Sequence, residues 1–164
     1  MSILMEKEIT IDRIILTNYK VFKALDDPIR GKIVQLLHKK QLNVEQISRR
    51  LKKFGYKKAV TTIRHHVEIL KDSGLIEIVK IEESRGAVTK YYGSSTKLLD
   101  FTLPLDFDKN YSKIITKTLP KLGKLVNSIS KIFPKTRKVH QISYNNYITM
   151  EIINRTMTNL LEKK

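Results

Sequence analysis

The chain has 164 residues and carries 32 lysine and arginine residues against 16 acidic residues, a formal net charge of +16. Its length suits one ordinary domain with a small appendage, and a hydrophobic content of 41% excludes wholesale disorder. The absence of cysteine excludes disulfides and thiolate metal sites. No apolar run approaches the roughly 18 residues that span a bilayer, and the first residues lack a signal-peptide pattern, so we expect a cytoplasmic protein. The surplus of positive charge favours a polyanionic partner.

The first predicted elements are short. Residues 1–16 are rich in isoleucine and fit either a strand or a helical turn, and in either form they could join a dimer interface. A short helix is expected over Tyr19–Leu25. Asp27 is a good N-cap and Pro28 suits the first helical position, which predicts a second helix over Pro28–Lys39.

Two helices and a hairpin form the central stretch of the chain. Asn43 and Gln46 have the spacing of a capping box and predict a helix that ends at Phe54. A basic turn leads to a helix over Lys58–Asp72, with Gly74 as its C-terminal cap. The order of helix, turn, helix and hairpin predicts a winged helix-turn-helix, a mainly α fold with a small β-hairpin (α+β).

The hairpin is expected from two β-like runs. They are Leu75–Ile81 and Val88–Tyr92, joined by a loop at Glu82–Gly86. The first run starts with alternation, which places Ile78 and Lys80 on the same face. Since a two-stranded hairpin is marginal alone, we expect it to lean on the helices.

The C-terminal third predicts two further helices. One starts at Lys109, is kinked or split by Pro120, and ends before Pro134. The other covers Ser143–Lys164 and is expected to be a dimerisation helix. Its apolar stripe, the predicted dimer interface, consists of Tyr147, Met150, Ile153, Met157, Leu160 and Leu161.

A row of lysines recurs every three or four residues in the first of these helices. Three interpretations remain open: a solvated face, an extension of a DNA-binding surface, and a helix on a membrane surface. Pro120 weakens the membrane interpretation, because it should interrupt the amphipathic helix, and no membrane partner is expected. The row consists of Lys109, Lys113, Lys117, Lys121 and Lys124.

Two motifs resemble ArsR-type winged-helix repressors. The run Val21–Val34, V-F-K-A-L-D-D-P-I-R-G-K-I-V, resembles the family's opening F-x-A-L-x-D-P-x-R-x-x-I. The run Thr62–Ile76 resembles its T-V-S-H-H-L-x-x-L-x-x-A-G-L-V. The resemblance covers about Tyr19–Leu98. It implies a homodimeric regulator that binds double-stranded DNA in a sequence-specific way, with a DNA-binding domain at 1–98 and helical dimerisation at 99–164.

An α-helix fits the major groove of B-DNA, so the helix over 58–72 is the expected reading element, and a wing at 82–87 would touch the backbone or the minor groove. The side chains expected to contact bases are Thr61, Thr62, Arg64 and His65. Those expected to contact phosphates, or to act from the wing, are Arg49, Arg50, Lys53, Lys57, Lys58, Arg85 and Lys90.

Two neighbours on the same helix have other expected roles. His66 lies near the apolar edge and is expected to be packed and hydrogen-bonded. Glu68 is expected to pair with Arg64 or Lys71.

Other functions are less well supported by the residues. The four histidines do not have metal-ligand spacing, so we expect no metal site. No catalytic motif is present, so we expect no cofactor and no enzymatic activity. The alternatives are a protein–protein module of a transcription or recombination assembly and a nonspecific nucleic-acid binder. The C-terminal third is too small for a separate ligand domain, so any small-molecule effector, whose nature the sequence leaves unknown, would bind at the dimer interface. We also expect the protein to associate with the nucleoid. Its Lys-rich composition is archaeal-like.

Overall fold

The computed structural model describes most of the chain: residues 16, 18–99, 101–135 and 138–162. The question of strand or helix in the N-terminal stretch therefore falls outside the described residues, apart from Leu16. The chain divides into two compact units, one formed by Thr17–Phe101 and the other containing Thr102–Lys164. Each unit is described by itself below.

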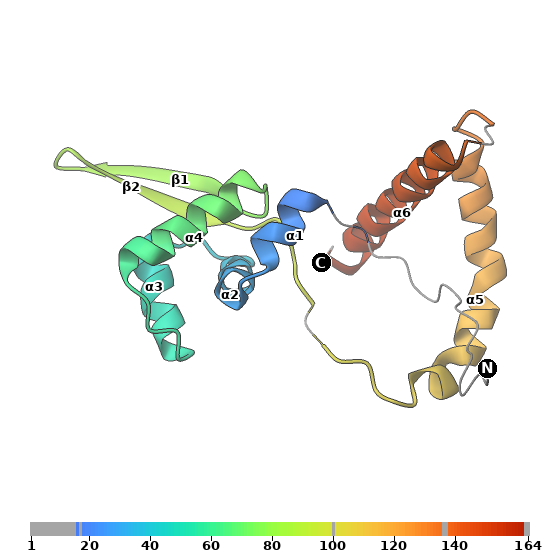
Figure 1. Ribbon diagram of the computed structural model, residues 1–164, viewed down its shortest axis with the longest axis horizontal. Helices are drawn as coiled ribbons and strands as arrows, with labels where there is room; N and C mark the ends of the chain where they lie inside the picture. The colour runs from blue at the N-terminus through green and yellow to red at the C-terminus, as the bar shows by residue number, and fades with distance from the viewer. Residues whose placement is uncertain (1–15, 17, 100, 136–137, 163–164) are drawn as a thin grey trace, which may run out of the picture. The chain divides into compact units, whose positions relative to one another are not determined.

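Among the described residues, the first unit has four helices and a hairpin, and the second has two long helices (Figure 1). This composition confirms the predicted fold class, mainly α with a small β-hairpin. The elements are α1 (Tyr19–Leu25), α2 (Pro28–Leu37), α3 (Val44–Lys53), α4 (Val60–Asp72), β1 (Glu77–Ser84), β2 (Ala87–Gly93), α5 (Phe107–Ser130) and α6 (Val139–Glu162).

Local capping signals set the helix starts of the first unit. The Asp27 carboxylate accepts from the Ile29 amide at 2.8 Å at the start of α2. Asn43 and Gln46 form the predicted capping box at α3, with reciprocal bonds of 2.9 and 3.0 Å. The end of α2 was predicted too late. Lys39 has a left-handed φ of 55°, which the helix cannot include, so α2 stops at Leu37.

The core of the first unit lies where α2, α3 and α4 pack together. Each helix contributes one apolar face, as its 3.6-residue periodicity requires. The fully buried side chains are Ile33, Val34, Leu37, Ile47, Leu51, Ile63, Val67 and Leu70.

The hairpin is joined to this core by a third short strand segment. Leu42, between α2 and α3, exchanges two backbone hydrogen bonds of 2.9 and 3.0 Å with Tyr92 of β2. Tyr92 is buried, and the Ser94 hydroxyl donates to the Leu75 carbonyl at 2.9 Å. The hairpin therefore packs on the helical core, as predicted.

The hairpin differs from its prediction in two ways. Its strands pair as far as Ser84 and Ala87, so only Arg85 and Gly86 form the turn, with φ of 51° and 76°. This two-residue turn with both φ positive suits the twist of the strands, and it converts most of the expected loop into strand. The predicted alternation is also wrong beyond Ile78, because the register shifts between Ile78 and Lys80 and leaves Val79 as the extra residue of a β-bulge.

Gly93 is the residue that accommodates this bulge. A Cβ at Gly93 would lie 2.9 Å from Val79 Cγ1, which is closer than real Cβ contacts. We expect Gly93→Ala to lower the free energy of unfolding by about 1–2 kcal/mol through overpacking, measured by chemical denaturation. Adding Val79→Ala should restore most of the loss. Equal destabilisation of the single and double variants would contradict this account of the bulge.

The described part of the second unit is mainly a hairpin of two helices with 24 residues each. α5 starts at Phe107 rather than Lys109 and runs through Pro120 without being split (Figure 1), so the predicted split is wrong. A proline inside a helix removes one backbone hydrogen bond and costs about 3 kcal/mol, but the other bonds of this 24-residue helix keep it continuous. α6 begins at Val139, four residues earlier than predicted, and its expected end lies beyond the described residues. No described helix is long and apolar enough to cross a membrane.

Candidate nucleic-acid interface

The exposed side of α4 carries the predicted base-contacting residues. Ile63, Val67 and Leu70 anchor the helix in the core, and their periodicity turns the opposite side to solvent. α4 begins at Val60, so Lys58 lies in the preceding turn and not in the helix, because Ala59 has the extended backbone of an N-cap. The residues that the first turns of α4 expose are Thr61, Thr62, Arg64 and His65.

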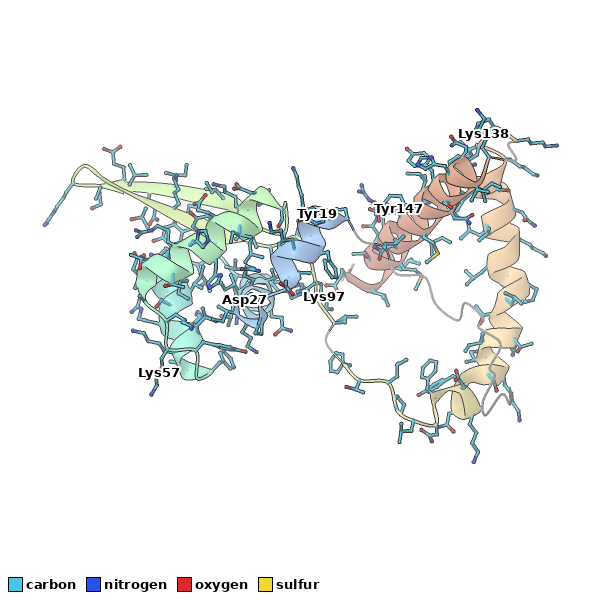
Figure 2. All side chains as sticks on the ribbon, viewed as in Figure 1. Tyr19, Asp27, Lys57, Lys97, Lys138 and Tyr147 are labelled. Atoms are coloured by element: carbon cyan, nitrogen blue, oxygen red, sulfur yellow. The ribbon has the colours of Figure 1, made fainter. Side chains whose placement is uncertain are left out.

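Basic residues surround the start of α4. Figure 2 shows Lys57 at the outer end of the turn that joins α3 to α4. Gly55, with φ of 87°, reverses the chain after α3 and starts this turn. Five side chains of α3 and the turn were predicted to meet phosphates, and all are exposed except the half-buried Arg50: Arg49, Arg50, Lys53, Lys57 and Lys58.

The wing places a further cation beside α4. Lys90 of β2 lines a groove of about 280 Å³ together with Arg64 and Glu68 of α4 and Glu45 of α3. The structure thus brings Arg64 and Lys90 to one groove, although 26 positions separate them in the sequence. Arg85 lies in the two-residue turn at the far end of the wing, fully outside this groove.

Arg64 already has an acidic neighbour. Its Nη2 lies 3.8 Å from Glu45 Oε1, and both side chains are more than half exposed. Glu68 pairs with Lys71 instead, whose ammonium donates to the Glu68 carboxylate. Of the two partners predicted for Glu68, Lys71 is therefore confirmed. The sequence did not reveal Glu45 as the partner of Arg64. The two residues are 19 positions apart, and no pattern within one helix predicts contact between the first turn of α3 and the second turn of α4.

We expect Glu45→Gln to tighten DNA binding by about two- to fivefold, because an exposed ion pair is worth roughly 0.2–1 kcal/mol and must be broken when Arg64 engages a base. The measurement is a duplex titration at fixed salt. Glu83→Gln on the wing removes the same charge away from Arg64 and serves as the control. Weaker binding of Glu45→Gln would show instead that the pair orients Arg64 for binding.

His65 and Arg64 lie on different edges of the exposed side of α4. His65 lines a second pocket, of about 560 Å³, with Tyr19, Lys20 and Lys23 of α1. Both edges are open to solvent, and Thr61 lies between them by helical projection. The predicted base-contacting residues therefore form one surface, with Arg64 toward the wing and His65 toward α1.

A polar cluster fixes α4 to the first two helices. Arg30 of α2 donates from Nε to the Ala24 carbonyl and from Nη2 to the Lys23 carbonyl at 3.1 Å, which caps the C-terminal end of α1. Its Nη1 lies 3.4 Å from Nδ1 of the buried His66. Asp27 Oδ2 lies 3.9 Å from both Arg30 Nη1 and His66 Nε2. The prediction that His66 is a packed edge residue is confirmed, and Asp27 and Arg30 have a structural role.

The environment of His66 favours its neutral form. Burial lowers the pKa of the imidazole, and the nearby positive charge of Arg30 lowers the pKa further, while Asp27 opposes both. With Nδ1 facing the Arg30 guanidinium as an acceptor, the ring proton is on Nε2, toward Asp27. A neutral His66 completes the cluster without adding a buried charge.

The predicted dimer stripe lies on α6, in the second unit. No residue of α6 is buried within the described part of this single chain. Leu160 and Leu161 are 67% and 72% exposed, Tyr147 and Met157 are exposed, and Met150 and Ile153 are half-buried against a groove toward α5. The C-terminal end of the stripe is thus open to solvent, and its middle faces α5.

The elements of the first unit define a class of protein. A helix-turn-helix with an exposed second helix, followed by a hairpin that packs on the same core, is a winged helix-turn-helix, and this is a DNA-binding class of domain. Residues 25–79 match the sequence model of a family described as "Helix-turn-helix domain". This match confirms the helix-turn-helix that the sequence predicts in this part of the chain.

One of the solved structures that this chain resembles is a bacterial DNA-binding domain. It is the homodimeric winged helix-turn-helix DNA-binding domain, fragment 1–100, of Mb0332 from Mycobacterium bovis, a possible ArsR-family transcriptional regulator. The two are 22% identical, with coverage of 63% of this chain and 79% of that chain and a TM-score of 0.35. A likeness this distant carries nothing about the binding or assembly of the present chain. No curated protein matches the chain.

Proposed function

We propose that the protein is a transcriptional regulator that binds double-stranded DNA in a sequence-specific way and acts as a homodimer. The observation that carries the proposal is the exposed start of α4, where Thr61, Arg64 and His65 face solvent from a helix fixed in the core. Such a helix fits the major groove, and an arginine there can bond a guanine through two hydrogen bonds. The basic α3–α4 turn and Lys90 would hold the flanking phosphates.

The dimer is supported by the apolar surface of the second unit. Of the described residues in α5 and α6, only Ile129 is buried, although both helices carry many apolar side chains. Two such helices cannot form a stable core by themselves, and a second copy would bury the open end of the α6 stripe. Two-fold symmetry would then set the two α4 helices about 34 Å apart, one turn of DNA.

The test is a binding selection from random duplex DNA with the full chain, followed by titration of the recovered duplex and a scrambled control from about 50 to 200 mM salt. We expect an inverted repeat that binds at least about 10³-fold more tightly than the control. Absence of an enriched site, with equal salt slopes for both duplexes, would favour a nonspecific nucleic-acid binder. Poor binding to every duplex would favour a protein–protein module.

A further inference from the structure

The proposed function leaves the lysines of α5 without a role. The helix carries five lysines and one acidic residue, Asp108. Projected at roughly 100° per residue, the five lysines fall within an arc of about 120°. We call this arc the α5 lysine face, and it consists of Lys109, Lys113, Lys117, Lys121 and Lys124.

The α5 lysine face is unpaired and open. All five side chains are exposed, and no ion pair joins any of them to a carboxylate among residues 16, 18–99, 101–135 and 138–162. Like charges four residues apart on a helix repel one another and destabilise it by a few tenths of a kcal/mol each. A row of phosphates would relieve this repulsion, whereas water only screens it.

The apolar side of α5 points in another direction. Val126 and Ser130 line a groove of about 700 Å³ with Ile142, Met150 and Ile153 of α6, and Ile129 beside them is buried. The side of α5 that carries these residues therefore faces α6. In the helical projection its centre lies about 170° from the centre of the α5 lysine face, so the lysines point away from the helical hairpin.

This orientation favours a nucleic acid over a membrane. A helix on a membrane surface inserts its apolar side among the lipids, with its cations at the headgroups. Val126 and Ile129 of α5 would first have to leave α6. The α6 helix, with Arg155 against Glu151 and Glu162, has no basic surplus that would hold the hairpin on an anionic membrane. A polyanion that touches only the lysines leaves the hairpin intact.

We propose that the α5 lysine face is a second DNA-binding surface, which contacts phosphates of the same duplex outside the site read by α4. This inference rests on the proposed function. From Lys109 to Lys124 the face extends about 22 Å, comparable to six base pairs of one DNA strand. Leu98 still packs on the core of the first unit, and the eight residues from Leu99 to Asp106 can span up to about 27 Å. The chain between the units is therefore long enough to bring this face to DNA beyond the α4 site.

The experiment compares two variants of the full chain on two duplexes. One duplex of about 20 base pairs holds only the selected site, and the other adds about 15 base pairs of arbitrary sequence at each end. Lys113→Gln/Lys117→Gln removes two charges from the α5 lysine face. Lys57→Gln/Lys58→Gln removes two charges from the α3–α4 turn and is the matched control. Helix content and unfolding midpoints by circular dichroism verify that both variants fold like the wild type.

We expect Lys113→Gln/Lys117→Gln to bind the long duplex at least about tenfold more weakly at 0.1 M salt, with a salt slope smaller by about two per chain, and to bind the short duplex unchanged. The control pair should weaken both duplexes alike. Equal binding of wild type and the α5 pair to the long duplex overturns the inference, even if a specific site is recovered. If no site is recovered, the proposed function fails separately, and two arbitrary-sequence duplexes of the same lengths still test the α5 lysine face. Cosedimentation of the wild type with anionic vesicles that is lost in the α5 pair, without any effect on DNA, assigns the face to a membrane and also overturns the inference.

Discussion

Replacing Arg30 with alanine should lower the free energy of unfolding by roughly 2–4 kcal/mol, because a charged donor to several partners is lost from a largely buried position. Arg30 donates to the Lys23 and Ala24 carbonyls and faces His66, and its side chain is only 13% exposed. Without it, the C-terminal carbonyls of α1 lose their cap and Asp27 keeps a charge with no guanidinium beside it. A typical domain has only about 5–15 kcal/mol of stability, so the loss should be large.

The measurement is denaturant unfolding followed by circular dichroism, near pH 8. Burial lowers the pKa of His66, so this histidine contributes stability that is present above its unfolded pKa, about 6.5, and is lost as the pH falls through its lowered folded pKa. At pH 8 it is neutral in both states and does not obscure the result. Arg49→Ala, which removes an exposed arginine of the same unit, is the control and should cost less than about 0.5 kcal/mol. Equal midpoints for the two variants would contradict the structural role of Arg30.

The cluster around Arg30 also explains what the first family-like motif does physically. In the run A-L-D-D-P-I-R, Asp27 caps α2 and Pro28 occupies its first position. The Arg30 guanidinium donates to backbone carbonyls in the last turn of α1. None of these residues belongs to the exposed side of α4. The motif therefore fixes the orientation of three helices, and the surface proposed to contact DNA lies elsewhere.

The helix-start signals of α2 and α3 and the apolar period of α4 were read correctly from the sequence. The capping box of Asn43 and Gln46, the Asp27-Pro28 start and the apolar period of α4 depend only on neighbours along the chain, so they could be recognised without a structure. The order of elements and the winged helix-turn-helix followed from them.

Features that depend on distant contacts could not be predicted in the same way. The pairing of Leu42 with Tyr92 and the contact of Arg30 with His66 join residues far apart in the sequence. The bulge at Val79 depends on the room that Gly93 leaves on the other strand. At the candidate site, the exposure of Arg64 was predictable from helical periodicity, but its ion pair with Glu45 required the packing of α3 against α4. The roles assigned to the site residues and to the α6 stripe remain predictions.

Replacing Arg64 with alanine should abolish most of the discrimination at one base pair of each half-site, at a cost of about 1–3 kcal/mol or roughly 5- to 150-fold. Arg64 is the only guanidinium on the exposed side of α4, and its planar fork of donors matches the O6 and N7 of guanine with two parallel hydrogen bonds. The measurement compares the selected duplex with duplexes changed at single base pairs. Arg49→Ala is the control, since a phosphate contact should weaken all these duplexes alike and reduce the salt slope by about one.

The neighbour of Arg64 makes this prediction more specific. If Glu45 holds Arg64 before binding, Glu45→Gln should tighten binding in the wild type more than in the Arg64→Ala background. Equal effects in both backgrounds would mean that Glu45 acts only through its repulsion of phosphates. Uniform weakening of every duplex by Arg64→Ala would assign Arg64 to the backbone as well, and sequence reading would then have to come from Thr61, Thr62 and His65. A difference confined to one base pair, lost with Arg64 and modulated by Glu45, would establish that α4 reads the major groove through this arginine.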